Sequence, residues 1–159
     1  MSRHWLAAIA LLVSTSASAD EPKRPTPTQQ PSVSVSCDVI EVWASHGKGN
    51  VDQKIAPRLA KQLQNTLKQS DLKQESSTKV TLSAKKAESI KLGKGSATIT
   101  LVETVNKAQL RITVDFNAAK GKATDTRLVA AGDWVVTSVN QTKDPATGDA
   151  HVLGVGNCK

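Results

Sequence analysis

Tyrosine is absent from the chain, and its few aromatic residues are Trp5, Trp43, Trp134 and Phe116. Proteins that bind sugars or single-stranded nucleic acids usually stack them on aromatic rings. A chain with so few rings, and with no motif of the nucleic-acid-binding folds, is not expected to bind nucleic acid. The same scarcity argues against a site that holds sugar rings by stacking.

Motifs for catalysis and metal binding are also missing. The chain has no GxSxG turn for a nucleophilic serine and no HxH or HExxH spacing. His46 and His151 are isolated, and the nearby Asp149 adds only a second ligand to His151, which does not make a metal site. Asp133, Asp144 and Asp149 fall in turn contexts, although carboxylate pairs of the glycosidase type stay open. We therefore expect no enzyme, no cofactor and no metal ion.

A glycine-rich turn at Gly47–Lys48–Gly49 connects a strand-like run to a helix-like run. A phosphate-binding P-loop needs the longer pattern GxxxxGK followed by Ser or Thr, and this turn runs instead into Asn50–Val51–Asp52. Binding of an anion by its backbone stays an alternative. We interpret the turn as a mobile corner that glycine permits.

The chain has two cysteines, Cys37 and Cys158, and neither has a CxxC partner or a nearby histidine. In an oxidising compartment, an even count of this kind predicts a disulfide bond. Closing so long a loop stabilises the fold by about 5 kcal/mol on the chain-entropy account. The first and last strands must then lie close together. A catalytic or metal-binding thiol is the alternative.

Residues 1–19 have the pattern of a signal peptide. A short polar start precedes the apolar run WLAAIALLV, and Ala17 and Ala19 follow the small-x-small rule of signal peptidase. The run is far shorter than the roughly 20 residues that cross a bilayer, so we expect cleavage before Asp20 rather than a retained anchor. The mature chain is expected to be periplasmic or secreted, with no transmembrane segment.

Residues 20–31, DEPKRPTPTQQP, hold four of the six prolines and no large apolar side chain. Such a segment has nothing to bury and favours an extended polyproline conformation. We interpret it as a disordered tether, with a proline-motif ligand as the alternative.

Residues 32–159 have a length that suits one domain. Apolar and polar residues alternate in short runs along it, and Gly, Asn, Asp and Pro separate the runs. The runs are SVSVSCDV, VIEVWA, TKVTLSA, ESIKLG, SATITLVETV, AQLRITVDF, TRLVAAGDWVVTSV and AHVLGVGNC. Their spacing predicts a mainly β (α+β) fold, an antiparallel sandwich or open barrel of about six to eight short strands with one amphipathic helix.

The helix is expected over about residues 56–69, where Ile55, Leu59, Leu63 and Leu67 recur every four residues. Pro57 fits only at the start of such a helix. In the first strand, the apolar alternation shifts by one near Val39–Ile40, which predicts a bulge or bend there.

The chain is basic, with a formal net charge of +7, or +6 once Arg3 leaves with the signal peptide. Such a charge attracts anionic surfaces. The densest basic region and the expected helix supply the candidate contacts for an anion or a partner, although a solvated basic face explains them equally. The first set is Lys79, Lys85, Lys86, Lys91 and Lys94, and the second is Lys54, Arg58 and Lys61.

The stretches IEVWASHGKGNVDQKIAPRLAKQLQ, GSATITLVETVNKAQLRITVDF and HVLGVG resemble a group of small exported bacterial proteins of unknown function. The resemblance covers most of residues 38–156. It implies a strand, a Gly-Asp loop, a short helix and a β-meander. It brings no functional residues with it.

These features favour a non-enzymatic exported module of the cell envelope that works by binding, through basic surfaces or edge strands. Its expected partner is an envelope protein or an anionic glycan or lipid surface. A small secreted inhibitor, which would insert the loop at 47–52 or at 143–149 into an enzyme, is the runner-up. A hydrolase comes third.

Overall fold

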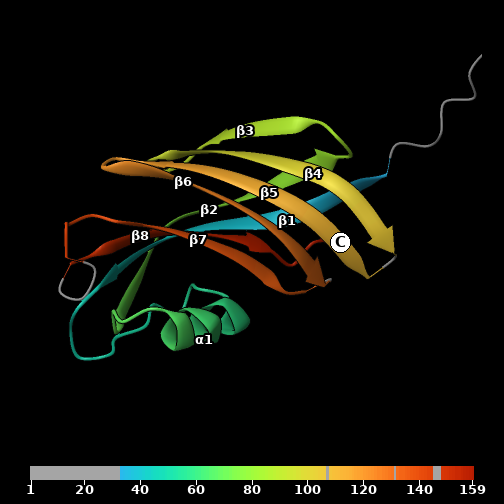
Figure 1. The fold of residues 1–159 in the computed structure, drawn as a ribbon. Coiled ribbons are helices and arrows are strands. Elements are labelled where there is room, and N and C mark those ends of the chain that lie inside the picture. Colours follow the sequence, from blue (N-terminus) through green and yellow to red (C-terminus); the bar gives the residue numbers. More distant parts are fainter. Residues whose placement is uncertain (1–32, 107, 131, 145–147) are drawn as a thin grey trace, which may run out of the picture. The chain divides into compact units, whose positions relative to one another are not determined.

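The computed structural model describes residues 33–106, 108–130, 132–144 and 148–159. The signal peptide expected at 1–19 and the tether expected at 20–31 lie outside the described residues. The described residues form eight strands and one helix, which confirms the predicted mainly β fold (Figure 1). The elements are β1 (Ser34–Ser45), α1 (Pro57–Thr66), β2 (Asp71–Ser83), β3 (Ala87–Lys91), β4 (Ser96–Asn106), β5 (Gln109–Ala118), β6 (Gly121–Ala130), β7 (Trp134–Asn140) and β8 (Ala150–Gly156).

The strands form two antiparallel four-stranded sheets. Sheet A has the order β2-β1-β8-β7, and sheet B has the order β3-β4-β5-β6. The sheets stack so that β2 lies beside β3 at one side of the sandwich and β7 lies beside β6 at the other (Figure 1). Apolar side chains from both sheets, among them Val39, Ile99 and Phe116, fill the space between them.

Strand β1 is buried on both faces, and this corrects the predicted bulge at Val39–Ile40. Cys37 and Val39 face the core between the sheets, whereas Ile40, Val42 and Ala44 face a second apolar cluster on the outer side. The alternation along β1 continues without a break. The irregularity lies further on, between Glu41 and Val42, where β2 carries one extra residue.

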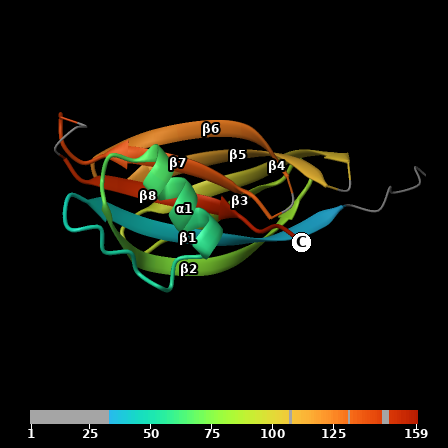
Figure 2. The same cartoon turned by 90° about the horizontal axis from the view of Figure 1, so that it is seen from below.

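Helix α1 covers the outer face of sheet A (Figure 2). It begins at Pro57, in the first helical turn as predicted, because that position needs no hydrogen-bonded N–H. Leu59 and Leu63 are fully buried, and Gly154 of β8 leaves room for the Leu59 side chain. The helix ends at Thr66, slightly before the predicted end. Among the described residues, no helix has the length and apolar character that crossing a membrane requires.

The predicted disulfide between Cys37 and Cys158 is present. It joins the start of β1 to the residues that follow β8, and β1 and β8 are neighbours in sheet A. Beside it, Ser36 and Lys159 exchange two main-chain hydrogen bonds of 2.8 and 2.9 Å. The expected approach of the first and last strands is therefore confirmed.

Candidate functional site

Two ionisable side chains, Glu41 of β1 and His151 of β8, meet inside the sandwich and are fully buried. His151 Nε2 lies 2.7 Å from Glu41 Oε1. A carboxylate can only accept, so Nε2 carries the hydrogen in this bond. The ladder between β1 and β8 holds the pair in place. It sets His151 opposite Trp43, which lies two residues after Glu41 in β1.

The Glu41 carboxylate also accepts hydrogen bonds from two other parts of the chain. Ser76 Oγ of β2 donates at 2.7 Å, and the main-chain N–H groups of Gly93 and Lys94 donate at 2.7 and 2.9 Å. Gly93 and Lys94 form the turn between β3 and β4, so this one carboxylate connects sheet A to sheet B.

Two opposing effects act on the pKa of Glu41. Burial alone would raise it, because the charged form loses its hydration. The hydrogen bonds from Ser76, the Lys94 N–H, His151 and the Gly93 N–H favour the charged form and outweigh burial. They hold the pKa of Glu41 below its ordinary value of 4.5. The side chain is therefore a carboxylate at neutral pH.

The His151 ring packs between aromatic side chains. Its centroid lies 4.9 Å from Phe116, edge to face, and 5.6 Å from Trp43. Its second nitrogen, Nδ1, is buried and has no hydrogen-bond partner. A second proton on the ring would leave a buried N–H without an acceptor, which is costly.

This arrangement does not fit nucleophilic catalysis. In a serine triad, histidine stands between the hydroxyl and the carboxylate, so that it can take the hydroxyl proton. Here Ser76 and His151 both bond to Glu41, and the carboxylate stands in the middle. With neither Glu41 nor His151 exposed, a substrate has no access to them. What the group can do is tie strands together.

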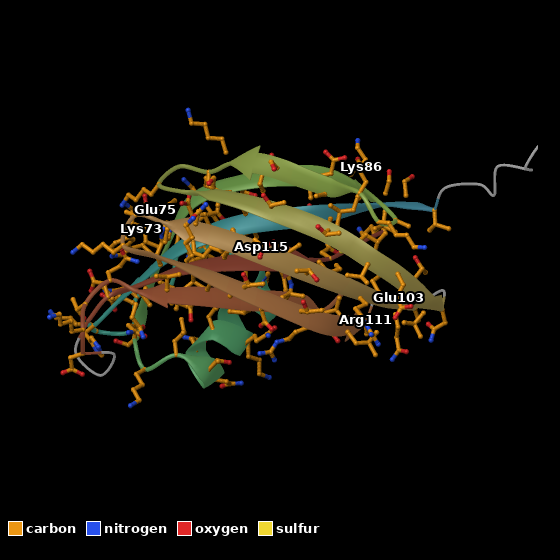
Figure 3. The ribbon with its side chains drawn as sticks, turned by 45° about the horizontal axis from the view of Figure 1, so that its top comes forward. Lys73, Glu75, Lys86, Glu103, Arg111 and Asp115 are labelled. Carbon is orange, nitrogen blue, oxygen red and sulfur yellow. A yellow bond between two sulfur atoms is a disulfide. The ribbon has the colours of Figure 1, made fainter. Side chains whose placement is uncertain are left out.

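Several polar contacts lie near Glu41 and His151, closer to the surface. Trp43 Nε1 donates to Asp149 Oδ2 at 3.0 Å, and Lys94 Nζ lies 4.7 Å from the centroid of the Trp43 ring. Glu75 Oε1 lies 3.4 Å from Lys73 Nζ and 3.3 Å from Lys94 Nζ. Figure 3 shows Lys73 and Glu75 close together. Asp149 therefore accepts a hydrogen bond from Trp43. It is not paired with His151, as a second metal ligand would be.

The glycine-rich loop is held by side chains at the start of β2. Asp71 Oδ1 accepts from the N–H groups of Gly49 and Asn50 at 2.7 and 2.8 Å, and Ser70 Oγ bonds to both main-chain groups of Gly47. The N–H groups of Gly47, Gly49 and Asn50 are thus already occupied and are not open to an incoming anion. These hydrogen bonds join the loop to the start of β2.

No metal centre is evident in the described ranges, since no three His, Cys, Asp or Glu side chains gather closely enough to hold an ion. His46 is exposed in the loop after β1, far along the chain from His151 inside the sandwich. The cysteines are joined to each other.

The first basic set lies along one side of the sandwich, where β2 and β3 are the edge strands of the two sheets. Lys79 lies in β2, Lys85 and Lys86 in the turn to β3, Lys91 at the end of β3, and Lys94 in the next turn. The closest ion pairs are Lys86 with Glu88 at 2.7 Å and Lys94 with Glu75 at 3.3 Å. Because Lys79 also lies 4.0 Å from Asp38, three of the five lysines are paired, and this surface carries less free charge than its sequence suggests. Lys85 and Lys91 have no carboxylate within 4.0 Å among the described residues.

The second basic set lies on the other side of sheet A. Arg58 and Lys61 project from α1, and Lys54 precedes the helix. Arg58 Nη1 lies 4.0 Å from Asp133 Oδ1, and both side chains are mostly exposed. The structure therefore gives the chain two separate basic surfaces and does not bring the two sets together.

A groove runs beside β7, between α1 and β6. Its main hollow, of about 340 Å³, is lined by Gln62 and Thr66 of α1, by residues 127–130 of β6, and by Trp134 and Val136 of β7. A second hollow of about 330 Å³ continues it toward Arg58 and Lys61. At the point where they meet, Gln62 Nε2 donates to the Trp134 carbonyl at 3.3 Å.

Neither the buried pair nor the groove was predicted from the residue patterns. An acidic residue inside the apolar run VIEVWA was a usable sign that Glu41 has a buried partner. Its partner lies 110 residues away, and only the fold reveals which residue it is. The groove likewise combines three elements that no local pattern connects.

Comparison of the chain with known protein families, with characterised proteins and with solved structures finds no match.

Proposed function

We propose that the chain is a non-enzymatic, exported binding module of the bacterial cell envelope, which acts through strand edges and basic surfaces. One observation carries the proposal. Glu41 and His151, the ionisable pair inside the sandwich, are fully buried, whereas an edge groove and two basic surfaces are open to a partner. A surface without a reaction centre is suited to docking.

Export is supported by the Cys37–Cys158 disulfide, because such bonds persist mainly in oxidising compartments. The signal-like residues 1–19 point the same way. In this proposal the partner is an envelope protein in the first place, and an anionic glycan or lipid surface is the alternative.

The test is retention of the mature chain on the envelope fraction of its own cells, washed at low and then at moderate salt. A purely electrostatic contact is released by salt, since exposed charges are screened over about 10 Å at 0.1 M ionic strength. A contact through strand edges stays. A chain that does not sediment with the envelope at either salt concentration contradicts the proposal.

Charge-reversal variants show which surface is used. Lys85→Glu with Lys91→Glu changes the β2–β3 side, where these lysines lack partners among the described residues. Lys54→Glu with Lys61→Glu makes the same change in charge beside α1 and is the matched control. Loss of retention in one double variant alone assigns the contact to that surface.

An inhibitor is a second candidate, because the loop at 47–52 has the form that an inhibitor needs. Residues 47–50 are all exposed, and Asp71 and Ser70 fix their backbone. A fixed, exposed loop loses little entropy on binding. An inhibitor forms a stoichiometric complex that survives high salt and that Asp71→Ala weakens. Hydrolysis that stops in a folded His151→Ala or Asp149→Ala variant, in contrast, identifies an enzyme.

A further inference from the structure

The sandwich has four edge strands, and one of them differs from the rest. Natural proteins protect exposed edges with charges, bulges or short length, since an open edge invites another strand to pair. Strand β2 has a bulge and four charged residues, β3 has only five residues, two of them charged, and β6 has three charged residues. Strand β7, Trp134–Asn140, has no charge, no proline and no bulge. It is the unprotected edge of sheet A.

The register of β7 shows which of its main-chain groups are open. Asn157 donates to the Asp133 carbonyl, and Gln141 donates to the Asp149 carbonyl. In an antiparallel ladder the pairs that bond alternate with pairs that do not. Val135, Thr137 and Val139 therefore bond to β8. The N–H and C=O groups of Val136, Ser138 and Asn140 point away from β8, toward the free edge.

The surroundings leave room for one more extended segment at that edge. The groove of about 340 Å³ runs past Trp134 and Val136, with α1 as one wall and β6 as the other. Ser138 and Asn140 are exposed further along the strand. A folded neighbour would meet α1 and β6 before its own edge reached β7, whereas a single strand is thin enough to enter.

The walls favour a particular chemistry in the segment. Trp134 and Val136 lie on the outer face of sheet A and offer apolar contact to a side chain of the segment on that same face. Helix α1 has no acidic residue, and Arg58 and Lys61 line the continuation of the groove. Asp133 opposes them only through a loose contact of 4.0 Å with Arg58. A carboxylate on the segment complements Lys61.

From these observations we infer that the free edge of β7 binds one extended segment of a partner protein by adding it as a further strand of sheet A. The segment places an apolar side chain against Val136 and an acidic one beside Lys61. This inference rests on the proposed binding function, and it adds the site and the class of partner. Affinity comes from the main-chain bonds and selectivity from the alternate side chains.

The test is selection of a phage-displayed library of short linear peptides on the mature chain, followed by synthesis of the selected peptide. We expect alternating apolar and acidic sequences. In the wild type, hydrogen exchange measured by NMR should slow at the Val136 and Ser138 amides when the peptide is added. The Ser89 amide is the control. It faces the free edge of β3, as the hydrogen bond from Leu92 to Gly95 and the alternation of the ladder show. Its exchange should not change, because the peptide binds at β7.

Two proline variants supply a matched pair. Ser138→Pro removes an edge N–H that β8 does not use, and Ser89→Pro does the same on β3. Ser138→Pro should weaken the peptide by at least about tenfold through the lost hydrogen bond and the bulk of the ring, while Ser89→Pro binds as the wild type does. Should Ser138→Pro fail to fold, the exchange measurement on the wild type decides the question, and Lys61→Glu should still weaken an acidic peptide.

Three results overturn the inference. They are a library that yields no binder, a peptide that leaves the β7 amides unprotected, and a wild-type dimer that Ser138→Pro dissociates, since a second copy would then cover the edge. Envelope retention that persists in a folded Ser138→Pro variant shows that the proposed function holds through another surface. If the wild-type chain is not retained on the envelope fraction, the proposed binding function is itself contradicted.

Discussion

The two sheets differ in how many of their faces are buried. Sheet A is covered by sheet B on one side and by α1 on the other, and all seven residues of β8 are buried. The outer face of sheet B has no helix over it among the described residues (Figure 1). It carries cross-strand polar pairs, such as Thr113 with Thr126 and Ser89 with Thr98.

This difference indicates that sheet A supplies most of the stability and that sheet B mainly closes the core. Burial of apolar area is the main favourable contribution to folding, and sheet A buries such area on two faces. The disulfide and the Glu41 carboxylate also belong to sheet A. Substitutions in sheet A should therefore cost much more than matched substitutions in sheet B.

The largest effect is expected from removing the disulfide that closes sheet A. Cys37→Ser with Cys158→Ser frees a loop with a sequence separation of 121 residues, which should cost about 5 kcal/mol of unfolding free energy. Urea unfolding measures the loss. Adding a reductant to the wild type should reproduce it and should leave the double variant unchanged. A loss close to zero would mean that the strand ladder alone holds the ends of sheet A.

A somewhat smaller effect is expected at the buried carboxylate. Glu41→Ala leaves the N–H groups of Gly93 and Lys94 and the ring of His151 without their acceptor, which should cost about 4 kcal/mol. The matched control is Glu103→Ala on sheet B, whose carboxylate pairs with Arg111 at 3.2 Å in an exposed position (Figure 3). That change should cost less than about 1 kcal/mol. Equal losses of stability in the two variants would contradict the larger share of stability that we assign to sheet A.

The packing of α1 on sheet A should come next. Leu59 is fully buried against Gly154 and Trp134, so Leu59→Ala should cost about 3 kcal/mol through lost contacts and the cavity left behind. Val105 of β4, which is 48% exposed, provides the control. Val105→Ala should change stability by no more than about 0.5 kcal/mol. Denaturant midpoints of the two variants test the ranking directly.

A smaller loss of stability is expected when the pH is lowered. The folded-state pKa of Glu41 lies below its ordinary value of 4.5, so the unfolded chain binds this proton first as the pH falls. The stability that the carboxylate contributes is present above that value, and it is lost as the pH falls through the folded-state pKa. Glu41→Gln should be less stable at neutral pH and should lose less on acidification. Parallel pH profiles for the two proteins would contradict this assignment.

The difference between the sheets also explains which parts of the fold could be predicted. In β4 and β5, Ile99, Leu101, Ile112 and Val114 alternate with polar residues because one face meets water, and these strands were predicted correctly. In β1, apolar residues lie on both faces, because α1 buries the second face, and this pattern was misread as a bulge or bend. A periodic pattern reports one buried face and cannot report two.

Edge strands are the second part of the fold that sequence patterns predict poorly. The first half of β2, from Asp71 to Ser77, and the first half of β6, from Gly121 to Asp125, are largely polar. Both lie outside the alternating runs from which strands were predicted. They are strands because a neighbouring strand pairs with them, and not because of their own side chains. Glu41 with His151, and the groove beside β7, depend on such long-range pairing as well.

The smallest effect is expected on the open face of sheet B. Thr113 and Thr126 are cross-strand partners whose hydroxyl oxygens lie 2.8 Å apart. Because both hydroxyls can bond to water instead, Thr113→Ala should cost only about 0.5 kcal/mol. Urea unfolding of Thr113→Ala, Thr126→Ala and the double variant should show the second substitution costing less than the first, since the pair is already broken. A loss as large as that of Leu59→Ala would place a hidden share of the stability on this face and would reverse the ranking of the two sheets.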